Sequence, residues 1–300
     1  MRIALVINAT SGSMADLDAE TIREKLQAAG FEAVPEPDGQ ASLPQRLETA
    51  AAHPGIEAVV VAGGDGSMAC AAAVMAGRDT PLGLLPLGTM NLLAKDLGLP
   101  IDLDEAIAAL KNGVARRIDV AEVNGHVFLI SSMLGLPATM GEHREAQRGK
   151  GSVRGAARFV VGLGRHLWRY PRLALTTIVD GEASRRRVHM LVVVNNDFVE
   201  KPGKIIERGS VDAGELTLYV APRLTSWRMA RLAAGMAAGW WHRLPGLERR
   251  VVGELTIESD KQALRVMNDG EIRLIETPLR YAIRPRALAV IVPKPDEERR

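Results

Sequence analysis

The chain has 300 residues, of which 47% are hydrophobic and 25% are charged, and its formal net charge is +2. These values are typical of a folded protein of about two modest domains, and they exclude a disordered or fibrous chain. The small net charge favours no polyanionic partner, and the basic residues are not interleaved with stacking aromatics, so nucleic-acid binding is not expected. Cys70 is the only cysteine, which excludes an intramolecular disulfide and fits a cytoplasmic protein.

Residues 1–120 alternate strand-like and helix-like runs, the pattern of a parallel α/β sheet. The apolar runs Ile3–Ile7, Ala58–Val61 and Leu82–Leu85 are the predicted buried strands. Helical spacing follows the first of them over Asp16–Ala29, and Gly30 is a stop signal for that helix. The sequence therefore predicts an α/β first domain over residues 1–120.

Strand-like runs dominate residues 121–300, and they predict a β-rich second domain of the sandwich type. Two helical segments interrupt them, Val153–Arg169 and Trp227–Gly239. The expected strands are Val127–Ser131, Leu173–Val179, His189–Val194, Leu216–Val220, Val251–Ile257, Ile272–Ile275, Leu279–Ile283 and Leu288–Val292. No run of ~20 apolar residues occurs, so any membrane contact is expected to be peripheral.

A glycine-rich turn, Gly63-Gly64-Asp65-Gly66-Ser67, follows the strand predicted over Ala58–Val61. Glycines let backbone N–H groups approach phosphate oxygens, and a helix N-terminus behind the turn favours negative charge. A carboxylate in such a turn repels phosphates unless a cation intervenes, so Asp65 points to Mg²⁺ or to a proton acceptor. The alternative is an ordinary turn in which Asp65 or Ser67 caps the helix.

A second turn, Gly88-Thr89-Met90-Asn91, follows the next predicted strand, so both turns are expected to open on one edge of the sheet. Thr89 and Asn91 can offer a hydroxyl and an amide to the same phosphates, or Thr89 can simply cap a helix. Neither turn matches the Walker or the Gly-x-Gly-x-x-Gly pattern.

Four motifs stand in the order found in the diacylglycerol kinase catalytic-domain family, which also includes bacterial lipid kinases, sphingosine kinases and ceramide kinases. They are Asn8-Ala-Thr-Ser-Gly12, Gly63-Gly-Asp-Gly-Ser67, Pro86-Leu-Gly-Thr-Met-Asn91 and Asp269-Gly-Glu271. The chain resembles this family over nearly its whole length. The resemblance implies a nucleotide-binding α/β domain followed by a β-sandwich-like domain, with the active site in the cleft between them. In such proteins the last segment can fold back toward the first domain.

The same resemblance implies a lipid kinase that uses ATP and Mg²⁺ to phosphorylate the hydroxyl of diacylglycerol, ceramide, a sphingoid base or another lipid alcohol. It makes Asp65 essential and a metal ligand, and it makes Glu271 the candidate base for the acceptor hydroxyl. From the residues alone, Glu271 beside the turn signal Asn268-Asp269-Gly270 is instead a solvent-facing glutamate. The residues that the resemblance places around the nucleotide are Asn8, Gly63, Gly64, Gly66, Ser67, Gly88, Thr89 and Asn91.

Three positions depart from the family pattern. Leu92 stands where diacylglycerol kinases usually have an aspartate, which brings into question the metal arrangement and diacylglycerol as the acceptor. Ala213-Gly214 replaces an Asp-Gly pair that helps to hold a structural Mg²⁺ in many bacterial members, with Asp212 one place early. Pro35 stands where a threonine often touches the nucleotide.

Two segments suit a lipid bilayer. Val153–Arg169 carries Arg154, Arg158, Arg165 and Arg169 on one side of a helical wheel and apolar residues on the other, which suits an anionic membrane surface at the inner face of the cell membrane. The alternative is a packed helix with solvated arginines. Trp227–Trp241 holds three of the four tryptophans and suits an acyl pocket, an interfacial anchor or core packing equally.

Two other functions stay open at this level. A nicotinamide dinucleotide kinase also uses a Gly-Gly-Asp-Gly loop, but the Asn-Glu pair that such enzymes use on the adenosine ribose is missing here. A catalytically silent lipid-binding relative is the second, and Leu92 and Ala213 are the residues that favour it. The acceptor, the preferred nucleotide and the oligomeric state do not follow from the sequence.

Overall fold

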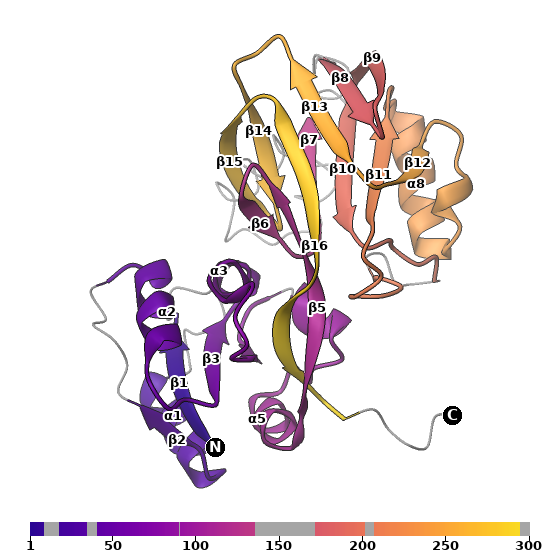
Figure 1. Ribbon diagram of the computed structural model, residues 1–300. Helices are drawn as coiled ribbons and strands as arrows, with labels where there is room; N and C mark the ends of the chain where they lie inside the picture. Colours follow the sequence, from indigo (N-terminus) through magenta and orange to yellow (C-terminus); the bar gives the residue numbers. More distant parts are fainter. Residues whose placement is uncertain (9–17, 35–40, 90, 136–171, 202–206, 295–300) are drawn as a thin grey trace. The chain divides into compact units, whose positions relative to one another are not determined.

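The computed structural model describes residues 1–8, 18–34, 41–89, 91–135, 172–201 and 207–294 (Figure 1). The segment Val153–Arg169, which carries the predicted basic stripe, lies outside these residues, as do Pro35 and residues 9–12 of the first motif. The described chain forms two compact units. The first comprises Met1–Val120, Val211–Gly214 and Arg284–Arg300, and the second comprises Ala121–Ser210 and Glu215–Ile283.

The first unit is built on a parallel sheet in the order β2-β1-β3-β4-β16. Buried aliphatic runs make its central strands, because side chains that are covered on both faces must be apolar throughout. Its strands are β1 (Arg2–Ile7), β2 (Glu32–Val34), β3 (Ala58–Gly63) and β4 (Leu82–Pro86), with residues 284–292 of β16 (Leu279–Val292) beside β4. Residues 114–120 of β5 (Val114–Val123) also belong to this unit, and β5 pairs with β16.

Five helices follow or connect these strands in the described part of the first unit: α1 (Ala19–Ala28), α2 (Leu43–Ala52), α3 (Asp65–Met75), α4 (Leu92–Asp96) and α5 (Leu103–Asn112). Their starts carry the expected signals, since Asp18 and Asp102 accept hydrogen bonds from first-turn amides and Ser42 forms a capping box with Gln45. The core lies between the sheet and helices α1 and α5, where Ile22, Leu26 and Leu110 pack against strand residues such as Leu5 and Val60.

The second unit contains two antiparallel sheets that share one core. One sheet has the order β12-β11-β10-β7-β14-β15, and the other includes β13, β8, β9 and the first part of β16. Alternating strand residues from both sheets, such as Val193, Leu218, Leu175 and Ile257, fill the space between them. The α/β domain and the sandwich-like domain expected from the sequence are both confirmed.

The strands of the second unit are β5 (Val114–Val123, of which residues 121–123 belong here), β6 (His126–Phe128), β7 (Ser131–Gly135), β8 (Leu173–Val179), β9 (Glu182–Val188), β10 (Met190–Asn195), β11 (Leu216–Ala221), β12 (Glu248–Val252), β13 (Leu255–Ser259), β14 (Ala263–Asn268) and β15 (Glu271–Glu276). Helix α8 (Ser226–Ala238) and the short 3-10 turn η2 (Trp241–Arg243) follow β11, and α8 lies beside the β10–β12 strands (Figure 1).

Three strand predictions were wrong in detail. The run Val127–Ser131 was expected as one strand, but it contains the end of β6, two residues outside any strand and the first residue of β7. The run Val251–Ile257 was expected as one strand, but the chain breaks at Gly253 and places β12 and β13 in different sheets. The runs Leu279–Ile283 and Leu288–Val292 were expected as two strands, but they belong to the single long strand β16. Arg286, with a φ of 50°, kinks β16 between these runs, and its backbone N–H donates to the buried Asp119 carboxylate at 2.7 Å.

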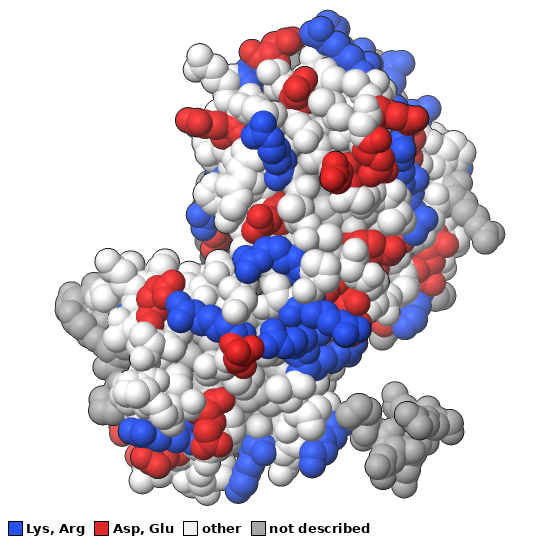
Figure 2. All heavy atoms as spheres, viewed as in Figure 1, with Lys and Arg blue, Asp and Glu red and all other residues white. Residues whose placement is uncertain are grey.

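Charges of both signs are mixed on the face shown in Figure 2, where carboxylates lie among the lysines and arginines. The described residues include exposed ion pairs such as Lys25–Asp104 at 2.5 Å and Arg185–Asp260 at 2.9 Å. Within the described residues, no helix is both long enough and apolar enough to cross a membrane.

Candidate active site

The first predicted loop joins β3 to α3. Gly64 is the N-cap of α3, and among the described residues no side chain caps it. The first bond of the helix runs from the Met68 N–H to the Gly64 carbonyl at 3.1 Å, so the amides of residues 65–67 have no partner within the helix. These amides and the positive end of the helix dipole form a site that is suited to an anion such as phosphate.

The second loop touches the first. Strands β3 and β4 are parallel neighbours with Gly63 opposite Pro86, and the Leu87 N–H donates to the Gly63 carbonyl at 2.9 Å. A Cβ atom added at Gly88 would lie 2.6 Å from the Gly64 Cα atom, so only glycine fits there. The expectation that both turns open on one edge of the sheet is confirmed.

Asn91 shapes the second loop from within. Its φ is 48°, it is 1% exposed, and its Oδ1 accepts from the Gly88 N–H at 2.9 Å. Its Nδ2 donates to the Gly88 carbonyl at 2.8 Å. Thr89, by contrast, is exposed. The Asn91 amide thus holds the loop in shape, whereas the Thr89 hydroxyl is accessible to a ligand.

Asp65 connects the two loops. It is the first residue of α3, and its Oδ1 accepts from the Leu92 N–H, the first amide of α4, at 2.7 Å. Its Oδ2 accepts no hydrogen bond from the described residues, so this oxygen can meet a ligand or a cation. The carboxylate therefore has a structural contact through one oxygen and an open position through the other.

Asn8 and Ser67 meet at the end of β1. The Asn8 Nδ2 donates to the Ser67 Oγ at 2.8 Å, and a Cβ atom at Gly63 would lie 2.6 Å from that Oγ. The predicted nucleotide residues of the first unit are thus brought together at the carboxyl ends of β1, β3 and β4. Arg46, which the sequence analysis did not single out, reaches the same edge from α2 and donates to the Ile7 carbonyl at 2.8 Å. Burial lowers the pKa of the Arg46 guanidinium.

The motif Asp269-Gly270-Glu271 lies in the second unit, at the turn between β14 and β15. Asp269 has a φ of 48°, and its buried carboxylate accepts from the backbone N–H groups of Leu129, Ile130 and Ser131 at 2.6, 2.9 and 2.9 Å. Burial raises the pKa of Asp269, while the three amides and Arg208 act in the opposite direction. Asp269 therefore ties the turn to the segment before β7 and fixes where Glu271 begins β15.

Glu271 itself is accessible. Its side chain is 48% exposed, and its Oε2 pairs with the Arg273 Nη2 at 3.0 Å on the same strand. This environment fits both a base and the solvent-facing glutamate that the turn signal predicts. Because Asp65 and Glu271 belong to different units, their meeting in one site stays a prediction.

Asn268, which the sequence analysis treated only as part of a turn, is a further candidate site residue beside Glu271. Asn268 is 5% exposed, and neither its Nδ2 nor its Oδ1 has a hydrogen-bond partner among the residues that the structure describes. In the β14–β15 register it lies directly opposite Glu271, so both side chains point to the same face of the sheet. A buried amide without a partner is costly, which makes Asn268 a candidate for contact with a polar ligand.

Asp212 and Gly214, beside the position of the family's Asp-Gly pair, both make polar contacts within the first unit. The Asp212 carboxylate pairs with the Arg116 guanidinium at 3.0 Å, and the neighbouring Gly214 N–H donates to the buried Asp119 carboxylate at 2.7 Å. Within the described residues, no three His, Cys, Asp or Glu side chains cluster as ligands of one metal ion.

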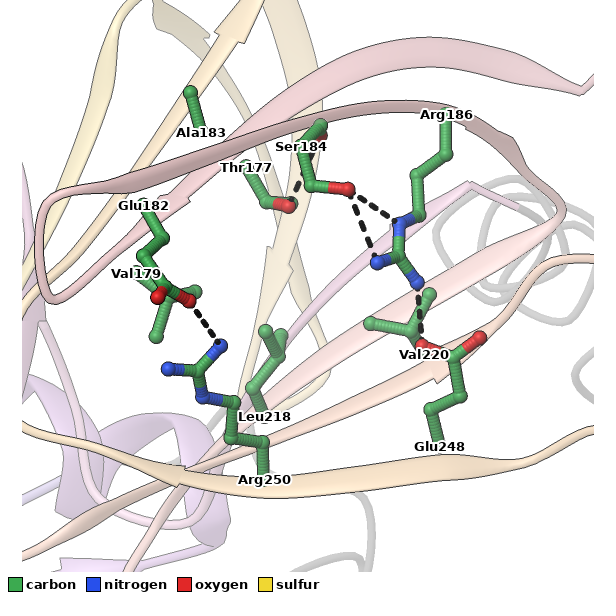
Figure 3. A pocket seen from close by; sticks show the side chains of 10 residues that line it. All are labelled: Thr177, Val179, Glu182, Ala183, Ser184, Arg186, Leu218, Val220, Glu248 and Arg250. Carbon is green, nitrogen blue, oxygen red and sulfur yellow. Dashed lines mark hydrogen bonds and ion pairs between the residues drawn. The ribbon is translucent and has the colours of Figure 1, made fainter.

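A pocket of about 260 Å³ opens in the second unit between the β8–β9 hairpin and β11–β12 (Figure 3). Val179, Leu218 and Val220 are its apolar lining, and its charged side chains bind one another. Arg186 pairs with Glu248 and Arg250 with Glu182, the latter at 3.6 Å. None of the predicted site residues lines this pocket, so we assign it no part in the chemistry.

Both parts of the chain match known families. Residues 2–123 match the diacylglycerol kinase catalytic domain, and residues 133–292 match the family described as the YegS C-terminal NAD kinase beta sandwich-like domain.

Relatives that are more than 30% identical to part of this chain include the following two proteins. A Mycobacterium tuberculosis protein named Diacylglycerol kinase is 37% identical over 33% of this chain and 32% of its own length. A Cronobacter sakazakii protein named Probable lipid kinase YegS-like is 35% identical over 40% of this chain and 42% of its own length. The chain thus aligns with less than half the length of each. The crystal structure of a diacylglycerol kinase from Bacillus anthracis superimposes with a TM-score of 0.69 at 18% identity, covering 97% of this chain and 96% of that one, and this likeness shows a shared fold.

Proposed function

We propose that this chain transfers the γ-phosphate of ATP to the hydroxyl group of a lipid, because it belongs to the diacylglycerol kinase catalytic-domain family. The observation that carries the proposal is the pair of touching loops in the first unit, where the uncapped start of α3 lies beside Gly88 and Asp65 joins both loops. The similar M. tuberculosis protein is named Diacylglycerol kinase, so diacylglycerol is the first acceptor to test.

The phosphate side of the reaction belongs to the first unit. The amides of residues 65–67 and the α3 dipole would bind phosphate oxygens, and Gly63, Gly64, Gly66 and Gly88 keep the backbone accessible to them. Asn8, Ser67, Thr89 and Asn91 would complete the nucleotide pocket, with Asn8 and Asn91 acting mainly on loop shape. Holding the phosphates in one orientation is most of the catalytic work in phosphoryl transfer.

The residues present fit Mg²⁺ at Asp65. A carboxylate oxygen is a hard ligand, and Mg²⁺ in nucleotide sites is usually held by one or two carboxylates together with the substrate phosphates. The free Oδ2 of Asp65 is available for this role, while Oδ1 stays on the Leu92 amide. Bound Mg²⁺ would neutralise charge on the β- and γ-phosphates.

The acceptor side belongs to the second unit. As the lipid oxygen bonds to the γ-phosphorus and the bond to the β–γ bridging oxygen breaks, Glu271 would accept the hydroxyl proton and ADP would leave. Asp269 would hold the turn that presents Glu271, through its three backbone contacts. Asn268, opposite Glu271, would hydrogen-bond a polar group of the lipid and orient the hydroxyl.

The direct test is transfer of radioactive phosphate from ATP, with Mg²⁺, to a panel of dispersed lipid alcohols. Diacylglycerol, ceramide and a sphingoid base form the panel, and NAD⁺ is included to detect a dinucleotide kinase. Labelled lipid phosphate supports the proposal. Labelled dinucleotide phosphate would replace it with the rival activity, and lipid binding without transfer would indicate the catalytically silent relative.

The role of Asn268 predicts opposite effects on stability and activity. In Asn268→Leu an apolar side chain with the same branching replaces an amide that has no partner among the described residues, so we expect the Tm to stay level or rise. The KM for the lipid should rise by ~10-fold, the usual size of one lost polar contact, while the Kd for nucleotide stays unchanged. Thermal melting and steady-state kinetics on one preparation check both effects. A lower Tm together with an unaltered KM would show that Asn268 is only a packing residue.

The proposal also includes where the protein works. A kinase for membrane lipids must reach them at a bilayer surface, so we propose a cytoplasmic protein that associates peripherally with an anionic membrane face.

A further inference from the structure

Helix α8 presents large aromatic side chains at both of its ends. It begins after Thr225, whose Oγ1 accepts from the Arg228 N–H at 3.3 Å, and it ends at Gly239, which has a φ of 74°. The side chain of Trp227, in the first turn, is 71% exposed, and Trp240, just beyond the last turn, is 46% exposed. Single exposed apolar residues are ordinary, but here two exposed tryptophans stand at the two ends of one helix.

Most of the exposed positions between the tryptophans are apolar. Ala230, Ala234, Ala237 and Ala238 are exposed in α8, and Arg228 and Arg231 are the exposed polar residues among the described side chains of this helix. The opposite side packs inward, since Met229 contacts the cluster of Ala221 and Leu224, and Gly235 lies against Leu244. The exposed side chains of α8 are therefore mostly alanines, together with Trp227 and two arginines.

The Asp, Glu, Lys and Arg residues of the chain segment that contains α8 are all basic. No aspartate or glutamate occurs between Glu215 and Glu248, whereas Arg223, Arg228 and Arg231 lie in this stretch. Among the described residues none of these three arginines pairs with a carboxylate, and Arg228 donates instead to the Arg223 carbonyl at 3.0 Å. Elsewhere in the unit, arginines such as Arg185 and Arg249 have acidic partners.

A shallow groove of about 130 Å³ lies along the same helix. Leu224, Leu232, Leu244 and Leu247 line it together with Arg228 and Arg231. Apolar side chains and guanidinium groups thus share one hollow, which suits a molecule with an apolar part and an anionic part.

We propose that Arg223, Trp227, Arg228, Arg231 and Trp240, called here the α8 surface, bind the surface of a bilayer that contains anionic phospholipid. Tryptophan favours the boundary between headgroups and acyl chains, and arginine favours anionic headgroups. A helix with an apolar outer face and basic residues lies in the plane of that boundary. The inference rests on the proposed function only in that a lipid kinase needs access to a bilayer. It differs from the basic stripe predicted over residues 153–169, which is a separate segment.

Tryptophan fluorescence distinguishes the two segments, because Trp168 belongs to the segment 153–169 and Trp227 and Trp240 lie on the α8 surface. The full chain is mixed with vesicles of phosphatidylcholine and phosphatidylglycerol whose acyl chains carry bromine, which quenches tryptophans that enter the boundary. We expect quenching in the parent chain, its loss in Trp227→Phe/Trp240→Phe, and its retention in Trp168→Phe. Quenching that disappears only with Trp168→Phe would assign membrane contact to the stripe and overturn the proposal.

Vesicle sedimentation tests the charges. Arg228→Gln/Arg231→Gln should weaken binding to phosphatidylglycerol vesicles by ~10-fold or more, and added salt should remove the difference. Arg187→Gln, an exposed arginine on β9, is the matched control and should bind like the parent. Equal binding by all three chains would overturn the proposal. The proposal would also be overturned if the parent chain does not bind vesicles but forms a dimer, and if Trp227→Ser dissociates that dimer. The α8 surface would then be an interface between two copies of the chain.

These measurements do not depend on catalysis. A chain that binds vesicles through the α8 surface but phosphorylates no lipid would retain this inference and lose the proposed function. A chain that phosphorylates dispersed lipid but fails both vesicle tests would do the reverse.

Discussion

Lipid phosphorylation is expected to fall by ~100-fold or more in kcat when Asp65 is replaced by asparagine, with little change in Tm. The amide oxygen of asparagine can still accept the Leu92 N–H, so the contact between α3 and α4 is kept. What is lost is the negative charge, and with it the ligand for a cation that neutralises the phosphates. Initial rates at saturating ATP and lipid, measured beside a thermal melt, give both quantities.

Asp65→Ala makes this experiment decisive, because alanine removes the charge and the hydrogen bond together. If the charge matters, the asparagine and alanine variants should be similarly slow. If Asp65 serves only to hold the Leu92 amide, asparagine should be nearly as active as the parent while alanine loses activity and stability. An active asparagine variant would therefore remove Asp65 from the chemistry.

Glu271→Gln is expected to lower kcat by ~100-fold or more while the Kd for nucleotide changes little. Glutamine keeps the size of the side chain and can still accept a hydrogen bond from Arg273, but it cannot take a proton from the acceptor hydroxyl. The nucleotide is expected to stay bound because the loops that would hold it belong to the first unit. Single-turnover kinetics and equilibrium nucleotide binding measure the two effects separately.

Glu276→Gln is the matched control for Glu271, since Glu276 is an exposed glutamate at the other end of β15. It should leave kcat unchanged. If Asp65 is the base, Glu271→Gln should chiefly raise the KM for lipid and preserve most of kcat. A normal kcat and a normal KM would leave Glu271 as a solvated residue beside a turn.

The nucleotide side of the candidate site could be predicted from the sequence because its order follows from local rules. Apolar runs mark β3 and β4, and the carboxyl ends of neighbouring parallel strands share an edge of the sheet. The glycines after each run then predict close backbone approach, which the contact between Gly88 and Gly64 confirms. No long-range information was needed for this part.

Other features depend on pairing that local sequence does not encode. β9 contains Arg185–Arg187, a charged run that became a strand because Asp180 and Gly181 turn the chain back along β8. The burial of Asn268 depends on its register with Ser132 and Glu271 in the sheet. A short polar turn motif predicts an exposed asparagine, so its missing hydrogen bonds became visible only in three dimensions.

Strand β16 has a consequence for how the protein is made. It lies beside β4 in the first unit's sheet, yet it is about 200 residues away from β4 in the sequence. During translation, residues 1–120 emerge long before this strand, so β4 presents unpaired backbone groups until residues 284–292 have been made. Shortened chains that stop before Arg284 would carry that open edge permanently, and association through it with other β-strands would compete with folding.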